Sequence, residues 1–241
     1  MVATRRSVIA GLPALAAAGT ARASAEPVDV LLVLAVDVSR SIDEDEAKLQ
    51  REGYRSAMTD PRVISAIRSG TLGGIATLYL EWASADYQRI VVPWTKIDGP
   101  STAARWADQL AEAPRVSMNW TSIFGAIEAS MRALNECPFE GTRRVIDISA
   151  DGVNNSGGPV TLMRDLAVDA GITINGLPIL NDRSPFGRPQ NMSLDQYFQD
   201  FVIGGPGAFM IAAEDFNAFQ GAVLRKLIRE ISGRALPASF A

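Results

Sequence analysis

Three oxygen-bearing side chains stand at alternate positions after an apolar run: Asp37, Ser39 and Ser41. Alternate residues of an extended segment point to the same side, so this spacing can aim three oxygen atoms at one point. Thr121 stands before an apolar pattern of helical spacing, and Asp151 follows the strand predicted for residues 143–149. Two carboxylates and three hydroxyls form a set of hard donors, which suits Mg²⁺.

The 241-residue chain contains no histidine and only one cysteine, Cys137. The missing histidine excludes a Ser-His-Asp triad, a Cys-His pair and a histidine zinc site. A soft metal would lack a ligand set, and an internal disulfide is impossible. We therefore interpret Cys137 as a small apolar residue near a helix end, and we expect any metal chemistry here to use oxygen ligands.

The order of apolar segments predicts the scaffold that must position these side chains. Runs typical of strands alternate with helical patterns, which favours a doubly wound α/β fold: a mostly parallel sheet with helices on both faces. The segments 73–83 and 88–97 form a predicted hairpin, and Pro93 favours an antiparallel edge strand for the second. Ligands of such sheets bind outside the carboxyl ends of the strands, where the three oxygen-rich segments lie.

The remaining predicted elements follow from the same periodicity. Asp43 and Glu46 have the spacing of a capping box, which starts a helix. We predict strands at 28–36, 143–149, 172–180 and 207–213, and helices at 44–59, 60–67, 102–111, 121–134, 159–170, 194–201 and 216–231.

The ordered set Asp37-x-Ser39-x-Ser41, Thr121 in TSIFGAI, and Asp151 in SADG resembles the metal-ion-dependent adhesion site (MIDAS) of the von Willebrand factor A (VWA) family. The resemblance covers nearly the whole chain after its first 25 residues. Residues 197–216 further resemble a group of exported bacterial proteins with this domain, to which we attach no activity. The family resemblance implies direct metal ligation by Ser39 and Ser41, direct or water-bridged ligation by Thr121, and water-mediated contacts from Asp37 and Asp151.

Neutral direct ligands would leave the metal attractive to an anionic oxygen from outside. We therefore expect an exported, divalent-metal-dependent module that docks an Asp or Glu carboxylate of a protein partner. Mg²⁺ is the expected ion, although Mn²⁺ and Ca²⁺ also accept oxygen donors. Two alternatives stay open: a Mg²⁺-dependent hydrolase or phosphoesterase with Asp37 as nucleophile, and a VWA-like interaction domain without a functional metal. Position 39 is Ser, where such hydrolases usually have a second Asp, so we expect no enzyme.

Each site residue also has a purely structural interpretation. Thr121 could be a helix N-cap, Ser41 and Asp43 could cap the first long helix, and Asp151 with Gly152 could form only a turn. Trp120, next to Thr121, could lie in the core or serve as an exposed anchor for a partner. The loop 181–193 is expected on the metal side of the sheet, where it could set partner choice.

Residues 1–25 have the features of a secretory leader, followed by a single predicted domain at 26–241. Arg5 and Arg6 precede a bland apolar stretch, and Ala23-Ser24-Ala25 forms a cleavage signal. The paired arginines favour twin-arginine export, with the general secretory route as the alternative, and either predicts a periplasmic or secreted protein. The apolar run is shorter than the ~20 residues that span a bilayer. Without the leader the net charge of −4 becomes −7, which does not favour nucleic acid or anionic lipid.

Overall fold

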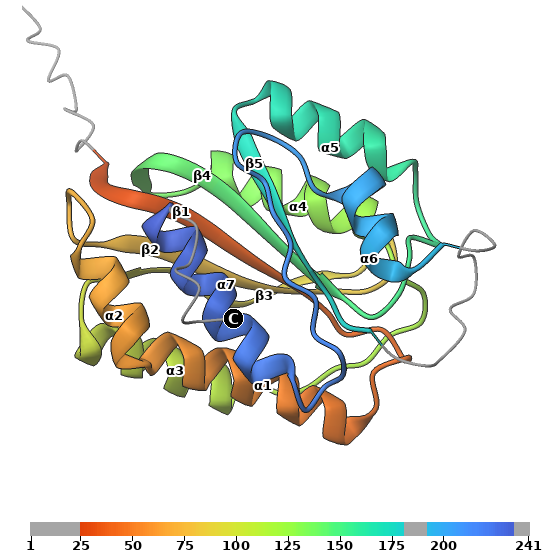
Figure 1. Cartoon of the computed structure of the whole chain (residues 1–241), viewed down its shortest axis with the longest axis horizontal. Helices are drawn as coiled ribbons and strands as arrows, with labels where there is room; N and C mark the ends of the chain where they lie inside the picture. Colours follow the sequence, from red (N-terminus) through yellow and green to blue (C-terminus); the bar gives the residue numbers. More distant parts are fainter. Residues whose placement is uncertain (1–24, 181–191, 234–241) are drawn as a thin grey trace, which may run out of the picture.

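A computed structural model describes residues 25–180 and 192–233, and its centre is one five-stranded sheet (Figure 1). Strand β1 (Glu26–Asp37) pairs in parallel with β2 (Ile75–Trp82) and β4 (Phe139–Ala150). Strand β4 also pairs in parallel with β5 (Ile172–Pro178), and β3 (Gln88–Ile97) is an antiparallel edge strand beside β2. This arrangement confirms the predicted sheet, including the edge position of Pro93. The strand order across the sheet is β3, β2, β1, β4 and β5.

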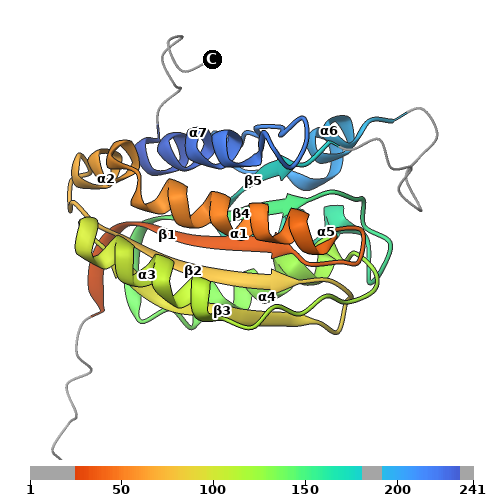
Figure 2. The same cartoon turned by 90° about the horizontal axis from the view of Figure 1, so that it is seen from below.

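Helices cover both faces of the sheet, as Figures 1 and 2 show. On one face lie α1 (Glu44–Thr59), α2 (Pro61–Arg68), α3 (Pro100–Glu112) and α7 (Phe219–Ser232); on the other lie α4 (Ile123–Asn135), α5 (Val160–Asp169), α6 (Leu194–Tyr197) and the π-helical turn Phe198–Val202. Strand β1 supplies both cores, with Leu32 and Leu34 on the first side and Val33 and Ala35 on the second. The uninterrupted apolar run in the sequence reflects this burial on both faces.

Two helix starts next to the candidate site have well-defined caps. At α1 the Asp43 Oδ1 atom accepts the backbone N–H groups of Asp45 and Glu46, and the Glu46 carboxylate accepts the N–H of Asp43. The predicted capping box is therefore confirmed. Helix α4 is capped by Ser122, whose hydroxyl accepts the N–H of Gly125 at 3.1 Å. The interpretation of Thr121 as that N-cap is wrong, since the N-cap is Ser122 and the helix begins at Ile123.

The predicted strand at 207–213 does not form a regular strand. This segment runs along β5 through isolated parallel bridges, Gly176 to Met210 and Ile179 to Ala213. The N–H of Phe209 donates to the side-chain Oδ1 of Asn175 at 3.0 Å, and Gly207 has a φ of +72°. Strand pairing is interrupted where a side chain accepts a backbone N–H that would otherwise bond to the neighbouring strand. It is also interrupted by a residue with a left-handed backbone.

The predicted leader, residues 1–25, lies outside the described residues except for Ala25. Most of the loop 181–193 also falls outside them, so its role in partner choice stays a prediction. In the described part of the chain, no helix combines the length and the apolar character needed to cross a membrane.

Candidate metal centre

The loop after β1 and the loop after β4 meet through a chain of short hydrogen bonds. The N–H of Ser39 donates to Asp37 Oδ1 at 2.7 Å, and the hydroxyls of Ser39 and Ser41 lie 2.9 Å apart. The Ser41 hydroxyl then donates to Asp151 Oδ1 at 2.7 Å. These loops meet because β1 and β4 are adjacent parallel strands, with Val36 in register with Ser149. The interpretation of Asp151 as only a turn residue does not account for its bond to Ser41.

Thr121 joins this group from the segment before α4. The backbone of Met118 exchanges two hydrogen bonds with the β1 loop, accepting from Arg40 at 2.9 Å and donating to Val38 at 3.2 Å. The N–H of Thr121 donates to Asn155 Oδ1 at 2.8 Å, and the N–H of Asn155 donates to the Thr121 carbonyl at 2.8 Å.

The Thr121 hydroxyl also lies next to the loop after β4. Its Oγ1 atom would be 3.7 Å from a Cβ atom placed on Gly152, the residue after Asp151. The structure therefore brings the five candidate residues to the carboxyl ends of β1 and β4 and to the segment leading into α4: Asp37, Ser39, Ser41, Thr121 and Asp151.

The electrostatics of the group favour a cation. Asp37 is fully buried and Asp151 nearly so. Burial raises the pKa of Asp37 well above its usual value, and the negative charge of Asp151 raises it further, although hydrogen bonds from Ser39 lower it. Among the described residues Asp37 Oδ2 has no hydrogen-bond partner. A buried carboxylate oxygen without compensation is costly, so this donor set fits a hard divalent ion better than a closed polar network.

No cluster of three or more His, Cys, Asp or Glu side chains suited to a metal exists in the part of the chain that the structure describes. A metal held here would therefore depend on the hydroxyls of Ser39, Ser41 and Thr121. Such ligands do not favour soft ions, in agreement with the sequence analysis.

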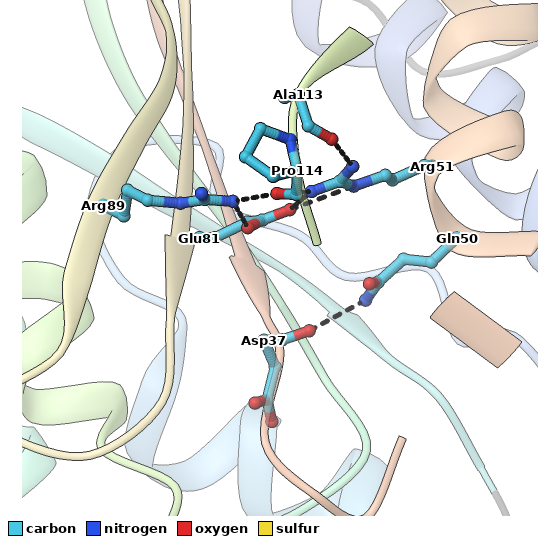
Figure 3. A network of polar contacts seen from close by, with 7 residues as sticks. All are labelled: Asp37, Gln50, Arg51, Glu81, Arg89, Ala113 and Pro114. Carbon is cyan, nitrogen blue, oxygen red and sulfur yellow. Dashed lines mark hydrogen bonds and ion pairs between the residues drawn. The ribbon is translucent and has the colours of Figure 1, made fainter. Parts of the chain in front are cut away.

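One ionic cluster near the site was not predicted from the sequence. It consists of Arg51, Glu81 and Arg89, and we call it the Glu81 clamp. The buried Glu81 carboxylate accepts from Arg51 at 2.6 Å and from Arg89 at 2.6 Å (Figure 3). The same guanidinium groups donate to the carbonyls of Ala113 and Pro114, each at 2.6 Å in its shortest contact. The clamp therefore fixes the segment that leads from α3 to Thr121.

Gln50 adds a direct contact to the site, since its amide donates to the Asp37 carbonyl at 3.2 Å (Figure 3). One signal for the clamp was available in the sequence, because Glu81 interrupts the apolar run of β2, where an acid is expected only with a partner. Its arginine partners could not be identified, since they lie on α1 and β3.

Trp120 is exposed, so the interpretation that it lies in the core is wrong. The residue is 56% exposed, and its φ of +68° is the only positive value among the non-glycine residues that the structure describes. A bulky residue in this region is a conformational outlier.

Residues 27–235 match the model of a family described as "Protein of unknown function (DUF1194)". The chain belongs to the DUF1194 family. A search of curated protein sequences gives no match for this DUF1194 chain.

Solved structures resemble the DUF1194 chain at low identity. Proximal thread matrix protein 1 of the mussel byssus superposes with a TM-score of 0.60 and 12% identity over 86% of this chain and 47% of its own. A form of that protein "with zinc occupied MIDAS motif" gives 0.57 and 14% over 85% and 45%.

Two bacterial structures are similar in the same way. The pilus adhesin SpaC of Lactobacillus rhamnosus GG gives a TM-score of 0.59 and 18% identity over 87% of this chain and 30% of its own. A von Willebrand factor type A structure from Catenulispora acidiphila gives 0.58 and 11% over 85% and 42%. The DUF1194 chain thus spans less than half the length of each of these structures. The comparisons show that it has a VWA-like fold.

Proposed function

We propose that this DUF1194 chain is an exported protein-binding module that docks a partner carboxylate through a divalent cation. The residues that would hold the ion are Asp37, Ser39, Ser41, Thr121 and Asp151. The observation that carries the proposal is the buried Asp37 Oδ2 atom, which has no hydrogen-bond partner among the residues that the structure describes. Burial raises the pKa of this carboxyl, and the negative charge of Asp151 raises it further. Mg²⁺ is the ion we propose, with Mn²⁺ or Ca²⁺ as oxygen-binding substitutes.

The hydroxyls and the carboxylates of the site have different roles in metal binding under this proposal. Ser39, Ser41 and Thr121 would supply neutral oxygen ligands, while Asp37 and Asp151 would supply the negative charge that retains a dication. A cation held mainly by neutral ligands offers strong attraction to an external Asp or Glu carboxylate. The hydrogen bonds already joining Ser39, Ser41 and Asp151 keep these groups oriented before any partner arrives.

The similar structures support this proposal at the level of the fold alone. One of them is a matrix protein of the mussel byssus that was solved with zinc at its MIDAS motif, and another is a pilus adhesin. Export is supported by the predicted leader with Arg5 and Arg6.

We propose no catalytic activity for this centre. A hydrolase with Asp37 as nucleophile would need that carboxylate accessible to a substrate, and Asp37 is fully buried. The chain also has no histidine to act as a general base.

The direct test is thermal unfolding of the purified protein with Mg²⁺ and with chelator. A ligand bound only by the folded state raises stability by about 2.7 kcal/mol at 100 times its Kd. We expect the melting temperature of the wild type to rise with Mg²⁺ and that of Asp151→Ala to stay unchanged. Partner capture from a periplasmic extract should then require Mg²⁺ in the wild type and fail for Asp151→Ala. An equal Mg²⁺ response in both proteins would remove the proposed site.

A further inference from the structure

We infer that Trp120 and Met118 form an apolar anchor beside the metal centre, and that the partner presents an acidic residue with an apolar side chain next to it. The inference rests on the proposed function and names the class of partner that the same site would select. Its starting observation is that two large apolar side chains are exposed in the one segment that carries Thr121: Trp120 is 56% exposed and Met118 is 39% exposed.

The backbone places both residues next to the candidate site. Met118 pairs with the β1 loop beside Ser39, and Trp120 precedes Thr121 directly. Consecutive Cα atoms are about 3.8 Å apart, so an indole on residue 120 lies within about 10 Å of the Thr121 Cα atom. A partner carboxylate bound at the site would bring its neighbouring side chains over this distance.

The conformation of Trp120 is energetically unfavourable. A left-handed backbone is sterically unfavourable for a non-glycine residue, and the exposed indole recovers little of this cost through burial. Glycine would accept the same φ of +68° without a side-chain penalty. Strained residues of this kind concentrate at functional sites, and tryptophan is enriched among the residues that dominate binding energy.

The segment that carries Trp120 is held on several sides. The Glu81 clamp binds the carbonyls of Ala113 and Pro114, and Arg115 donates to the carbonyl of Asp43 at 2.9 Å. After Trp120, the N–H of Ser122 donates to the Ala83 carbonyl at 2.6 Å. A fixed segment loses little conformational entropy when it binds, so the exposed side chains are preorganised for contact. An apolar pair next to a carboxylate-binding ion selects a partner segment that combines an acid with an apolar neighbour.

The test uses random heptapeptides displayed on phage, selected on the immobilised protein with Mg²⁺ and eluted with chelator. We expect enrichment of Asp or Glu with an aliphatic or aromatic residue beside it. The variant Trp120→Gly removes the anchor and suits the backbone, so it should fold, keep the wild-type Mg²⁺ affinity and lose the apolar preference. Binding of a selected peptide should weaken at least tenfold in Trp120→Gly and recover in Trp120→Phe. Leu72→Ala is the matched control. Leu72 is 49% exposed, and it lies in the loop before the amino end of β2, whereas the candidate site lies at the carboxyl ends of the strands.

Each outcome decides between the two proposals. Enrichment of the acid without an apolar neighbour, or an unchanged preference in Trp120→Gly, overturns the anchor and leaves carboxylate docking intact. The absence of acid enrichment, or binding that resists chelator, overturns carboxylate docking and the anchor together.

Discussion

The substitution Asp37→Asn should stabilise the metal-free protein while it abolishes the response to Mg²⁺. This direction is unusual for a buried polar residue, because removing one normally costs stability. It follows from the surroundings of Asp37: burial disfavours its charge, the negative charge of Asp151 opposes it further, and its Oδ2 atom has no hydrogen-bond partner within the described ranges. The amide keeps an oxygen for the Ser39 N–H, which now donates to Oδ1 at 2.7 Å.

The magnitude follows from the groups involved. Neutralising Asp37 removes a desolvated charge and the repulsion from Asp151. It leaves an amide N–H₂ that must find an acceptor, and this donor reduces the gain in stability by about 1–3 kcal/mol. A desolvated ion costs several kcal/mol, so a net gain of about 2 kcal/mol remains. For a domain of this size each kcal/mol shifts the melting temperature by about 2–4 °C, so we expect a rise of about 4–8 °C at pH 8 without metal.

Glu81→Gln is the matched control, since it makes the same change of charge in an equally buried carboxylate on the neighbouring strand β2. Glu81 is bonded to Arg51 and Arg89, so its loss leaves two guanidinium groups without their anion. We expect a loss of about 3 kcal/mol, or roughly 6–12 °C.

The assay is calorimetric or fluorescence-monitored unfolding of the three proteins in chelator and in saturating Mg²⁺. If metal-free Asp37→Asn melts below the wild type, or retains the full Mg²⁺ shift, the argument from an uncompensated Asp37 charge is refuted.

The gap in melting temperature between metal-free Asp37→Asn and wild type should widen from pH 4 to pH 8. A carboxyl whose folded pKa is raised binds its proton more tightly in the folded state, so its contribution to stability is present at low pH and lost as pH rises through the folded pKa. Burial and the charge of Glu230 raise the pKa of Asp147 to about 7, but Asp147 is present in both proteins, so its effect on the difference in melting temperature largely cancels. A difference that narrows as pH rises would contradict the raised pKa of Asp37. Arg89→Met should weaken Mg²⁺ binding about tenfold, measured by titration calorimetry, because Arg89 holds both Glu81 and the Pro114 carbonyl. Lys226→Met is the control for Arg89→Met, because Lys226 lies in a separate buried cluster, 2.6 Å from Asp147. This control should lose stability and keep its Mg²⁺ affinity. Equal losses of Mg²⁺ affinity in the two variants would show that the Glu81 clamp only stabilises the fold.

Most of the fold could be predicted from the sequence because its signals are local. The capping box at Asp43 and Glu46 spans four residues, and the edge position of β3 follows from Pro93 within its own segment. The prediction failed at 207–213, where the apolar pattern is typical of a strand but the Asn175 side chain takes a backbone hydrogen bond. That competitor lies 34 residues away and leaves no trace in the segment itself.

The sequence by itself determined the chemistry of the candidate centre: its types of oxygen donor, their order along the chain and the absence of histidine. Only the tertiary structure decided which of these oxygens have partners. Ser41 and Asp151 are separated by 110 residues, yet a hydrogen bond joins them, while Asp37 Oδ2 has no hydrogen-bond partner in the described part of the chain. The structure alone also decided that Trp120 is exposed with a left-handed backbone and that Arg51 and Arg89 fix its segment. Burial, charge compensation and strain depend on neighbours brought together by folding, so no local pattern could reveal them.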